Sequence, residues 1–555
     1  MNNSAKYFFI RCFELLHPKA FDTYRVSLHN PFTIFWELEK SIEKYHKKRI
    51  RNFDPTITSI GEEAKSQIEN ECLDCVFRFG SFTKKQASII LENTCIKSID
   101  GKKNRTLSLI CNTLIYENKD FKNNLIHKLK DLLVEDNNAN FEKINTYTSW
   151  LISQLLFHGY SRKFIIDRIR KSQAFVEKGN KVEDAFGKFE SVFTNEAENY
   201  EVIFKYKRNS FEEIRIASQY ISKIEAFPIG FANSLYVNEK FKEKGEGEFY
   251  LSVQIESYDF WSALRKAYPI VSESIELNVL HDSNNRIFLD KQALVIHSQS
   301  KRYRMETTEE NLDGFYNYQE QEFYRFVDNF KNLGEDSVAR EKIRSAIRFY
   351  KLGSDSVEIE HKILNYWIGF EQLFSSVDSD EDSIKRIKSF FISINAVYYW
   401  QRRTNYLLSS LKRTGKSMSV VDLIPANNML FEELNPLMQS RLSAYIIKLN
   451  NPSALKAAIE KHTKRLEQHL TRIYRLRNEL VHEGKSSVDL FLIAGHLRHY
   501  LLFSIEQITN ELIDNQPLQN LDDVFVYFEN LLTRIKDAKN IQEIFSIKEY
   551  KGYME

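Results

Sequence analysis

The stretch Leu466–Gly484, LEQHLTRIYRLRNELVHEG, decides the fold of the C-terminal part of the chain. Its apolar residues recur at helical spacing and predict an α-helix with one face in the core of a bundle: Leu466, Leu470, Ile473 and Leu480. Gly484 is a typical residue just beyond a helix C-terminus, so we expect the helix to end there.

An arginine interrupts this apolar stripe. The helical period places Arg477 on the core-facing side, where a guanidinium is costly unless a carboxylate or a phosphate meets it. Arg475 points nearly opposite, away from the core-facing side. Glu371 falls inside the apolar stripe of a second predicted helix, EIEHKILNYWIGFEQLFSSV at 358–377. We therefore expect Glu371 and Arg477 to form a buried pair, and removing one partner to cost about 3–5 kcal/mol.

His482 follows Arg477 by five residues, about 140° round an ideal helix. It falls in the last helical turn, where the negative end of the helix dipole favours a protonated imidazole. A guanidinium that neutralises charge and an imidazole that moves a proton suit phosphoryl chemistry. The spacing alone is weak, because RCFELLH from Arg11 to His17 has a similar one. The position of Arg477 on the apolar stripe and the adjacent Asn478 favour the pair Arg477 and His482.

Composition indicates a mainly helical protein. The 555 residues are 43% hydrophobic and 28% charged, with a net charge of +2, 17 Gly and 9 Pro. Segment 441–482 holds nine Lys or Arg against three acidic residues, so a basic surface is local. It is either a phosphate-binding patch, with Arg472, Arg475, Lys464 and Arg465 as candidate RNA-binding residues, or a solvated helix face.

Four segments are expected. Residues 1–195 are a helical region, 196–310 a small β-rich domain, 311–515 a helical bundle and 516–555 a helical extension, so the fold is mainly α and α+β overall. Alternating segments at 200–208, 247–257, 273–283 and 290–300 predict the strands. The chain has no glycine-rich phosphate loop, which argues against a nucleotide-hydrolysing motor.

Cys72 and Cys75 form a single CxxC without a second one. We expect them in a buried helix or strand as small apolar residues, with no metal site and no cofactor. The chain shows neither a signal peptide nor a stretch of about 18 uncharged apolar residues, so a cytoplasmic location without membrane insertion is expected.

The segment RLRNELVHEG resembles the R-N-x-x-V-H-x-G core of HEPN (higher eukaryotes and prokaryotes nucleotide-binding) domains. ILNYWIGFEQLF is similar to the tryptophan-plus-glutamate helix of the Apea-like HEPN subgroup, and the resemblance covers roughly 340–515. It implies a HEPN-type helical bundle, usually dimeric, that cleaves RNA without a metal. Arg477, Asn478 and His482 match the catalytic positions, and Glu371 and Glu479 are expected to support them.

Two functions of different classes follow from this resemblance. The first is an endoribonuclease of phage defence by abortive infection, or a toxin, that leaves 2′,3′-cyclic phosphate and 5′-OH ends. RNA (tRNA among the candidates), a phage-derived trigger, and a second copy of the chain in a homodimer or higher homo-oligomer are its expected partners. The second is a non-catalytic assembly or sensor module that binds RNA or a partner protein.

Overall fold

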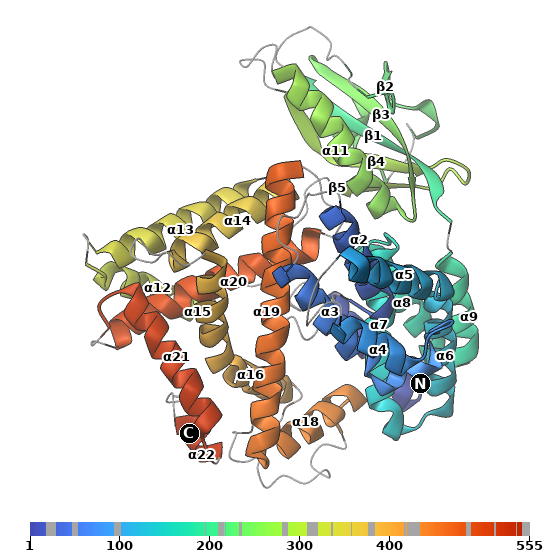
Figure 1. Cartoon of the computed structure of the whole chain (residues 1–555). Coiled ribbons are helices and arrows are strands. Elements are labelled where there is room, and N and C mark those ends of the chain that lie inside the picture. The colour runs from blue at the N-terminus through green and yellow to red at the C-terminus, as the bar shows by residue number, and fades with distance from the viewer. Residues whose placement is uncertain are drawn as a thin grey trace. The chain divides into compact units, whose positions relative to one another are not determined.

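The computed structural model is mainly helical, and its five-stranded antiparallel sheet lies, in chain order, between N- and C-terminal helical regions (Figure 1). This confirms the expected fold class at the level of secondary structure. The structure describes residues 1–17, 29–46, 54–93, 101–194, 196–208, 216, 218–231, 236–279, 287–307, 320–334, 337–356, 358–375, 383–413, 415, 418, 433–483, 490–515, 518–539 and 541–546.

The chain divides into two compact units that differ from the four expected segments. One unit comprises Met1–Gln154 together with Leu312–Glu555, and the other comprises Leu155–Asn311. The first helices of the chain therefore share a unit with the C-terminal bundle. Among the described residues, no helix is both long and apolar enough to cross a membrane.

The regular elements described in the N-terminal part of the first unit are all helices. Its elements are α1 (Asn3–Leu16), α2 (Pro31–His46), α3 (Asp54–Ile68), the 3₁₀ helix η1 (Glu71–Cys75), α4 (Lys84–Leu91), α5 (Gly101–Glu117), α6 (Phe121–Glu135), η3 (Asn138–Asn140) and α7 (Phe141–Phe157). Helix α2 packs on α3 and α5, and buries Ile34, Phe35, Leu38 and Ile42 at helical spacing.

The C-terminal part of this unit supplies its longest helices. Its elements are α12 (Glu320–Asn332), α13 (Val338–Asp355), α14 (Ile359–Phe374), α15 (Ser383–Val397), α16 (Tyr399–Arg413), α18 (Pro436–Leu449), α19 (Pro452–Glu483), α20 (Leu490–Asp514), α21 (Leu521–Asp537) and α22 (Ile541–Ser546). Helix α19, orange in Figure 1, contacts α14 and α15 of the bundle and also α3 of the N-terminal part.

The second unit is built round the sheet. Its strands are β1 (Glu198–Arg208), β2 (Ile221–Ile224), β3 (Glu248–Ser257), β4 (Ile287–His297) and β5 (Tyr303–Thr307), in the order β2-β3-β1-β4-β5. Its helices are α8 (Arg162–Glu177), α9 (Val182–Val192), η4 (Ile229–Phe231), α10 (Glu239–Lys242) and α11 (Phe260–Val279). Alternate residues of β1 enter two different cores, so both faces of the sheet are covered.

Asp259 joins the start of α8 to the start of α11 within this unit. Its carboxylate accepts the backbone N–H of Ser161 at 2.7 Å and the N–H groups of Trp261 and Ser262 at 2.9 Å. Ser161 caps α8 by accepting the N–H of Phe164 at 3.1 Å. The carboxylate thus satisfies backbone donors at the ends of two helices.

The expected strand at 273–283 is wrong. Residues 273–279 belong to α11, which packs on the sheet, whereas 280–283 lie outside the described residues. Burial at Leu264, Ala267, Val271 and Ser274 follows the helical period. The alternation of SIELNV resembled a strand because the window was too short to separate the two periods.

The expectation of two buried cysteines in the CxxC is also wrong. Cys72 is half-buried and Cys75 is exposed, and both lie in η1 rather than in a regular helix or strand. Asn70 caps this short element by accepting the backbone N–H of Cys72 at 2.9 Å.

Candidate active site

Arg477 meets Glu371 where α19 crosses α14. The guanidinium Nη2 lies 3.8 Å from Oε2 of Glu371, and Nη1 donates to the side-chain oxygen of Asn478 at 3.0 Å. One helical turn earlier, the ring of Trp367 packs on that of Tyr474 at 5.8 Å. The ion pair follows the aromatic contact by about one turn on both helices. The two contacts together fix the register in which Arg477 faces Glu371.

The pair is less buried than expected. The side chains of Arg477 and Glu371 are 28% and 25% exposed. Leu476, 3% exposed, occupies the core position between Ile473 and Leu480 that the helical period had assigned to Arg477. Arg477 therefore lies at the edge of the apolar stripe, where its guanidinium reaches water.

His482 belongs to the last turn of α19, but its side chain lies outside the described residues, as does Gly484. The helix extends to Glu483, which agrees with the expected end. Arg477, Asn478 and His482 are thus brought to one end of one helix, whereas the geometry between the imidazole and the guanidinium stays a prediction.

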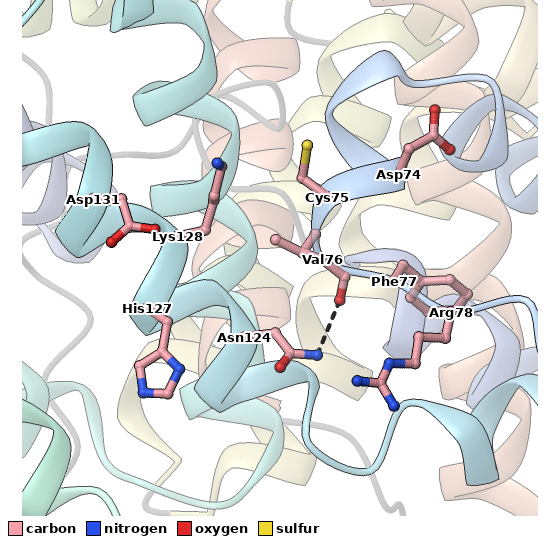
Figure 2. Close-up of a pocket in the computed structure, with 9 residues that line it drawn as sticks. All are labelled: Asp74, Cys75, Val76, Phe77, Arg78, Asn124, His127, Lys128 and Asp131. Atoms are coloured by element: carbon pink, nitrogen blue, oxygen red, sulfur yellow. Dashed lines mark hydrogen bonds between the residues drawn. The ribbon is translucent and has the colours of Figure 1, made fainter. Parts of the chain in front are cut away.

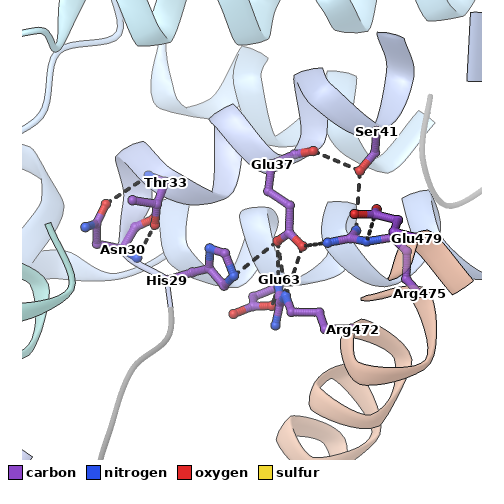
Figure 3. A network of polar contacts seen from close by, with 9 residues as sticks. All are labelled: His29, Asn30, Thr33, Glu37, Ser41, Glu63, Arg472, Arg475 and Glu479. Carbon is purple, nitrogen blue, oxygen red and sulfur yellow. Dashed lines mark hydrogen bonds and ion pairs between the residues drawn. The ribbon is translucent and has the colours of Figure 1, made fainter. Parts of the chain in front are cut away.

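Arg472, one of the candidate RNA-binding residues, lies in a buried network (Figure 3). Its Nε and Nη2 donate to Oε2 of Glu37 on α2, both at 3.1 Å, and Nη2 also pairs with Glu63 on α3. The side chains of Arg472 and Glu37 are 10% and 8% exposed. Burial by itself raises the pKa of the Glu37 carboxyl, but the adjacent Arg472 guanidinium holds that pKa far below its usual range. This arginine is neutralised by carboxylates of the same chain.

Arg475 has carboxylate partners too. It pairs with Glu37, and its Nε lies 3.6 Å from the carboxylate of Glu479 (Figure 3). Glu479, expected to support Arg477, instead pairs with Lys44 of α2 at 2.7 Å. The face of α19 opposite its apolar stripe is therefore covered by the N-terminal helices.

The remaining two RNA-binding candidates are exposed. Lys464 is 57% exposed and lies 3.2 Å from Glu62, and Arg465 is exposed as well. The basic surface that α19 offers to a phosphate is therefore smaller than the local count of basic residues indicates.

Sequence reasoning missed the acidic partners Glu37 and Glu63. A signal existed for Glu37: it lies on α2 beside the apolar stripe formed by Ile34 and Leu38, and it is 6% exposed. A glutamate in such a position needs a cation, as Glu371 does. Because residues 1–195 were expected to form a separate region, no arginine of α19 was expected to pair with Glu37.

No protein-family model, no curated protein and no solved structure matches the chain. Within the described ranges, no group of three or more His, Cys, Asp or Glu is arranged to hold a metal ion.

Proposed function

We propose that the protein is a metal-independent endoribonuclease whose active site is built on Arg477, Asn478 and His482, as the resemblance to HEPN domains implies. One observation carries the proposal. Among the described residues, Arg477 has a single carboxylate within ion-pair distance, at 3.8 Å, which is too long for a hydrogen bond. Its guanidinium combines partial exposure with a fixed orientation, which is what a phosphate-binding arginine needs.

In the proposed reaction, the ribose 2′-oxygen attacks the adjacent phosphorus and the 5′-oxygen of the next nucleotide leaves. His482 removes the proton from the 2′-OH or gives one to the departing 5′-oxygen. Arg477 stabilises the negative charge that grows on the non-bridging oxygens. The products are a 2′,3′-cyclic phosphate and a 5′-OH.

Glu371 and Asn478 would act by positioning. Each touches the Arg477 guanidinium and neither needs to reach the reacting atoms. The 3.8 Å ion pair leaves the charge of Arg477 only partly compensated, so an incoming phosphate still gains from it. A shorter, bidentate carboxylate, as Arg472 has, would compete with the substrate.

The test is cleavage of a single-stranded RNA in EDTA by the wild type and by two variants, Arg477→Ala and His482→Ala. We expect the loss of either side chain to lower the cleavage rate by about 10²-fold or more. Matched controls are Arg344→Ala on α13 and His361→Ala on α14, which remove an exposed arginine and an exposed histidine of the same bundle. Wild-type rates in either site variant would refute the proposed site.

The alternative, a non-catalytic module, predicts another pattern in the same experiment. The wild type would leave the RNA intact, while RNA or partner binding would still depend on Arg477. The Glu371–Arg477 contact by itself fits a structural ion pair as well, so cleavage is the observation that separates the two functions.

A further inference from the structure

The CxxC motif places two thiols on one side of η1. In a 3₁₀ helix residues three apart eclipse each other, and a rise of about 2.0 Å per residue brings their α-carbons to roughly 6 Å. A disulfide spans about 4.4–6.8 Å between α-carbons. Both Cys72 and Cys75 are free thiols, and Cys75 is exposed. The backbone of η1 therefore holds the two residues at a separation that one S–S bond can bridge.

Tyr147 of α7 holds the backbone of η1 by a hydrogen bond. Its hydroxyl donates to the carbonyl oxygen of Cys72 at 2.9 Å, and burial together with the neighbouring cysteines raises its pKa. Asn124 of α6 donates to the carbonyl of Val76 at 3.3 Å (Figure 2). Two helices thus hold the backbone on both sides of Cys75.

Cys75 lines a pocket of about 410 Å³ that carries charges of both signs (Figure 2). Arg78 and Lys128 supply two cations to this pocket, and His127 and Asp131 also line it. The carboxylate of Asp74, also in the wall, is neutralised by Lys84, with both oxygens at 3.1 Å from its Nζ. The remaining charges favour a small ligand with carboxylates and an ammonium group.

We propose that Cys72 and Cys75 are a redox-active dithiol, and that the pocket binds a carboxylate-bearing low-molecular-weight disulfide as their oxidant. The Cys75 thiolate attacks one sulfur of that disulfide, which forms a mixed disulfide and releases one thiolate. The Cys72 thiolate then attacks Sγ of Cys75, closes the Cys72–Cys75 bond and releases the second thiolate. The two protons of the dithiol end on the released thiols, and two electrons pass to the external disulfide.

Exposure and acidity set this order of attack. Burial raises the pKa of the Cys72 thiol, so Cys72 is the poorer first nucleophile. Cys75 faces the pocket, where the oxidant arrives. Cys72 acts as the resolving thiol, which needs only to reach Sγ of Cys75.

The experiment exposes the folded full-length protein to oxidised glutathione and follows each thiol by alkylation and peptide mass spectrometry. We expect wild-type Cys72 and Cys75 to end in one intramolecular disulfide. Cys72→Ser should stop at a glutathione adduct on Cys75, and Cys75→Ser should leave Cys72 reduced. Cys12 and Cys111, both fully buried, are internal controls and should stay reduced.

A second arm tests the pocket. The double variant Arg78→Gln/Lys128→Gln should slow the reaction with oxidised glutathione and leave the reaction with cationic cystamine equal or faster. Two outcomes overturn the proposal: both thiols stay reduced under an excess of oxidant, or Cys75 forms only a stable adduct in the wild type. Equal rates for the double variant and the wild type with oxidised glutathione overturn the assigned ligand class.

Discussion

Arg472 and Arg477 lie five positions apart on α19 and differ in how far their charges are neutralised. Arg472 has two carboxylates at a buried position, whereas Arg477 has one at 3.8 Å and reaches water. The buried cation contributes to holding the fold, and the partly exposed one is available to a ligand. This contrast, not the number of basic residues on α19, singles out Arg477.

Their carboxylate partners should therefore differ in what they contribute to stability. Because Glu371 and Arg477 are both about one-quarter exposed, Glu371→Gln should lower the free energy of unfolding by less than about 1 kcal/mol. The larger loss expected from the sequence assumed that this pair is buried. Glu37 is buried, so Glu37→Gln should lower the free energy of unfolding by about 3–5 kcal/mol.

Urea unfolding of both variants measures these two losses. Glu62→Gln, which removes the exposed partner of Lys464, is the control and should stay within about 1 kcal/mol of the wild type. A larger loss for Glu371→Gln than for Glu37→Gln would contradict the burial described for the two pairs. The cleavage rate of Glu371→Gln should fall although the fold persists.

His469 should make the protein sensitive to mild acid. Its Nδ1 lies 2.9 Å from the hydroxyl of Tyr500, and burial, with His496 and Arg472 nearby, holds its pKa well below the usual value. In the unfolded chain a histidine has a pKa of about 6.5. Below that pH the unfolded chain binds a proton at His469 that the folded chain does not bind. The stability that His469 contributes is therefore complete above about pH 6.5 and declines as the pH falls below it.

The measurement is the free energy of unfolding at about pH 7.5 and about pH 5.5. His469→Gln should reduce the difference between the two values, and replacing the exposed His127 by Gln should leave it unchanged. An equal difference in wild type and His469→Gln would contradict the account. The buried Glu37 loses its contribution in a lower window, below about pH 4.5, because its pKa is depressed.

At the scale of elements, α14 lies close to α13 because Gly369 has no side chain. A Cβ added there would lie 3.1 Å from the carbonyl oxygen of Ala346, 3.1 Å from Cβ of Phe349 and 3.2 Å from Leu501. Gly369→Ala should therefore destabilise the protein by about 1–3 kcal/mol, although alanine is the better helix former.

Gly187 in α9 is the matched control for that substitution. An added Cβ there meets no described atom within 4 Å, so Gly187→Ala should stabilise by up to about 1 kcal/mol. Thermal unfolding of the two variants gives the sign of each change. A stabilising Gly369→Ala would show that α13 and α14 are less tightly packed than described.

Elements with long periodic patterns were predictable, and short ones were not. The stripe from Leu466 to Leu480 predicts α19, and Ser161 marks the start of α8, because the period and the cap are local properties of the sequence. Residues 273–279 and Cys75 were misassigned, since a short alternation fits a strand or a helix and nothing local reports exposure. The Glu371–Arg477 contact was predictable because both residues lie at or beside apolar stripes, whereas the burial of Arg477 was overestimated because Leu476 fills the core position.

At the scale of the whole molecule, the carboxylates that bind Arg472 and Arg475 come from helices more than 400 residues earlier in the chain. No local pattern reveals such a contact, so the division into consecutive segments missed that α2 and α3 share a unit with α19. The candidate RNA-binding surface was overestimated for the same reason.

Assembly into a homodimer remains a prediction. One Arg477 and one His482 diverge by about 140° on an ideal helix, and a two-fold axis near the end of α19 would bring both copies of each to one cleft. Mixing Arg477→Ala with His482→Ala should then restore part of the cleavage that each lacks alone. A wild type that is monomeric by light scattering and fully active would contradict this arrangement.

In the proposed reaction, the 2′-oxygen of RNA is the nucleophile at a site made by Arg477 and His482. The most direct measurement is the identity of the ends that the wild type produces from RNA in EDTA, by mass spectrometry, with a 2′-deoxy substitution at the cleaved nucleotide as the matched substrate. The account predicts 2′,3′-cyclic phosphate and 5′-OH ends, and no cleavage at the substituted position. Products with 3′-OH and 5′-phosphate ends, or cleavage that persists at the 2′-deoxy nucleotide, would contradict it.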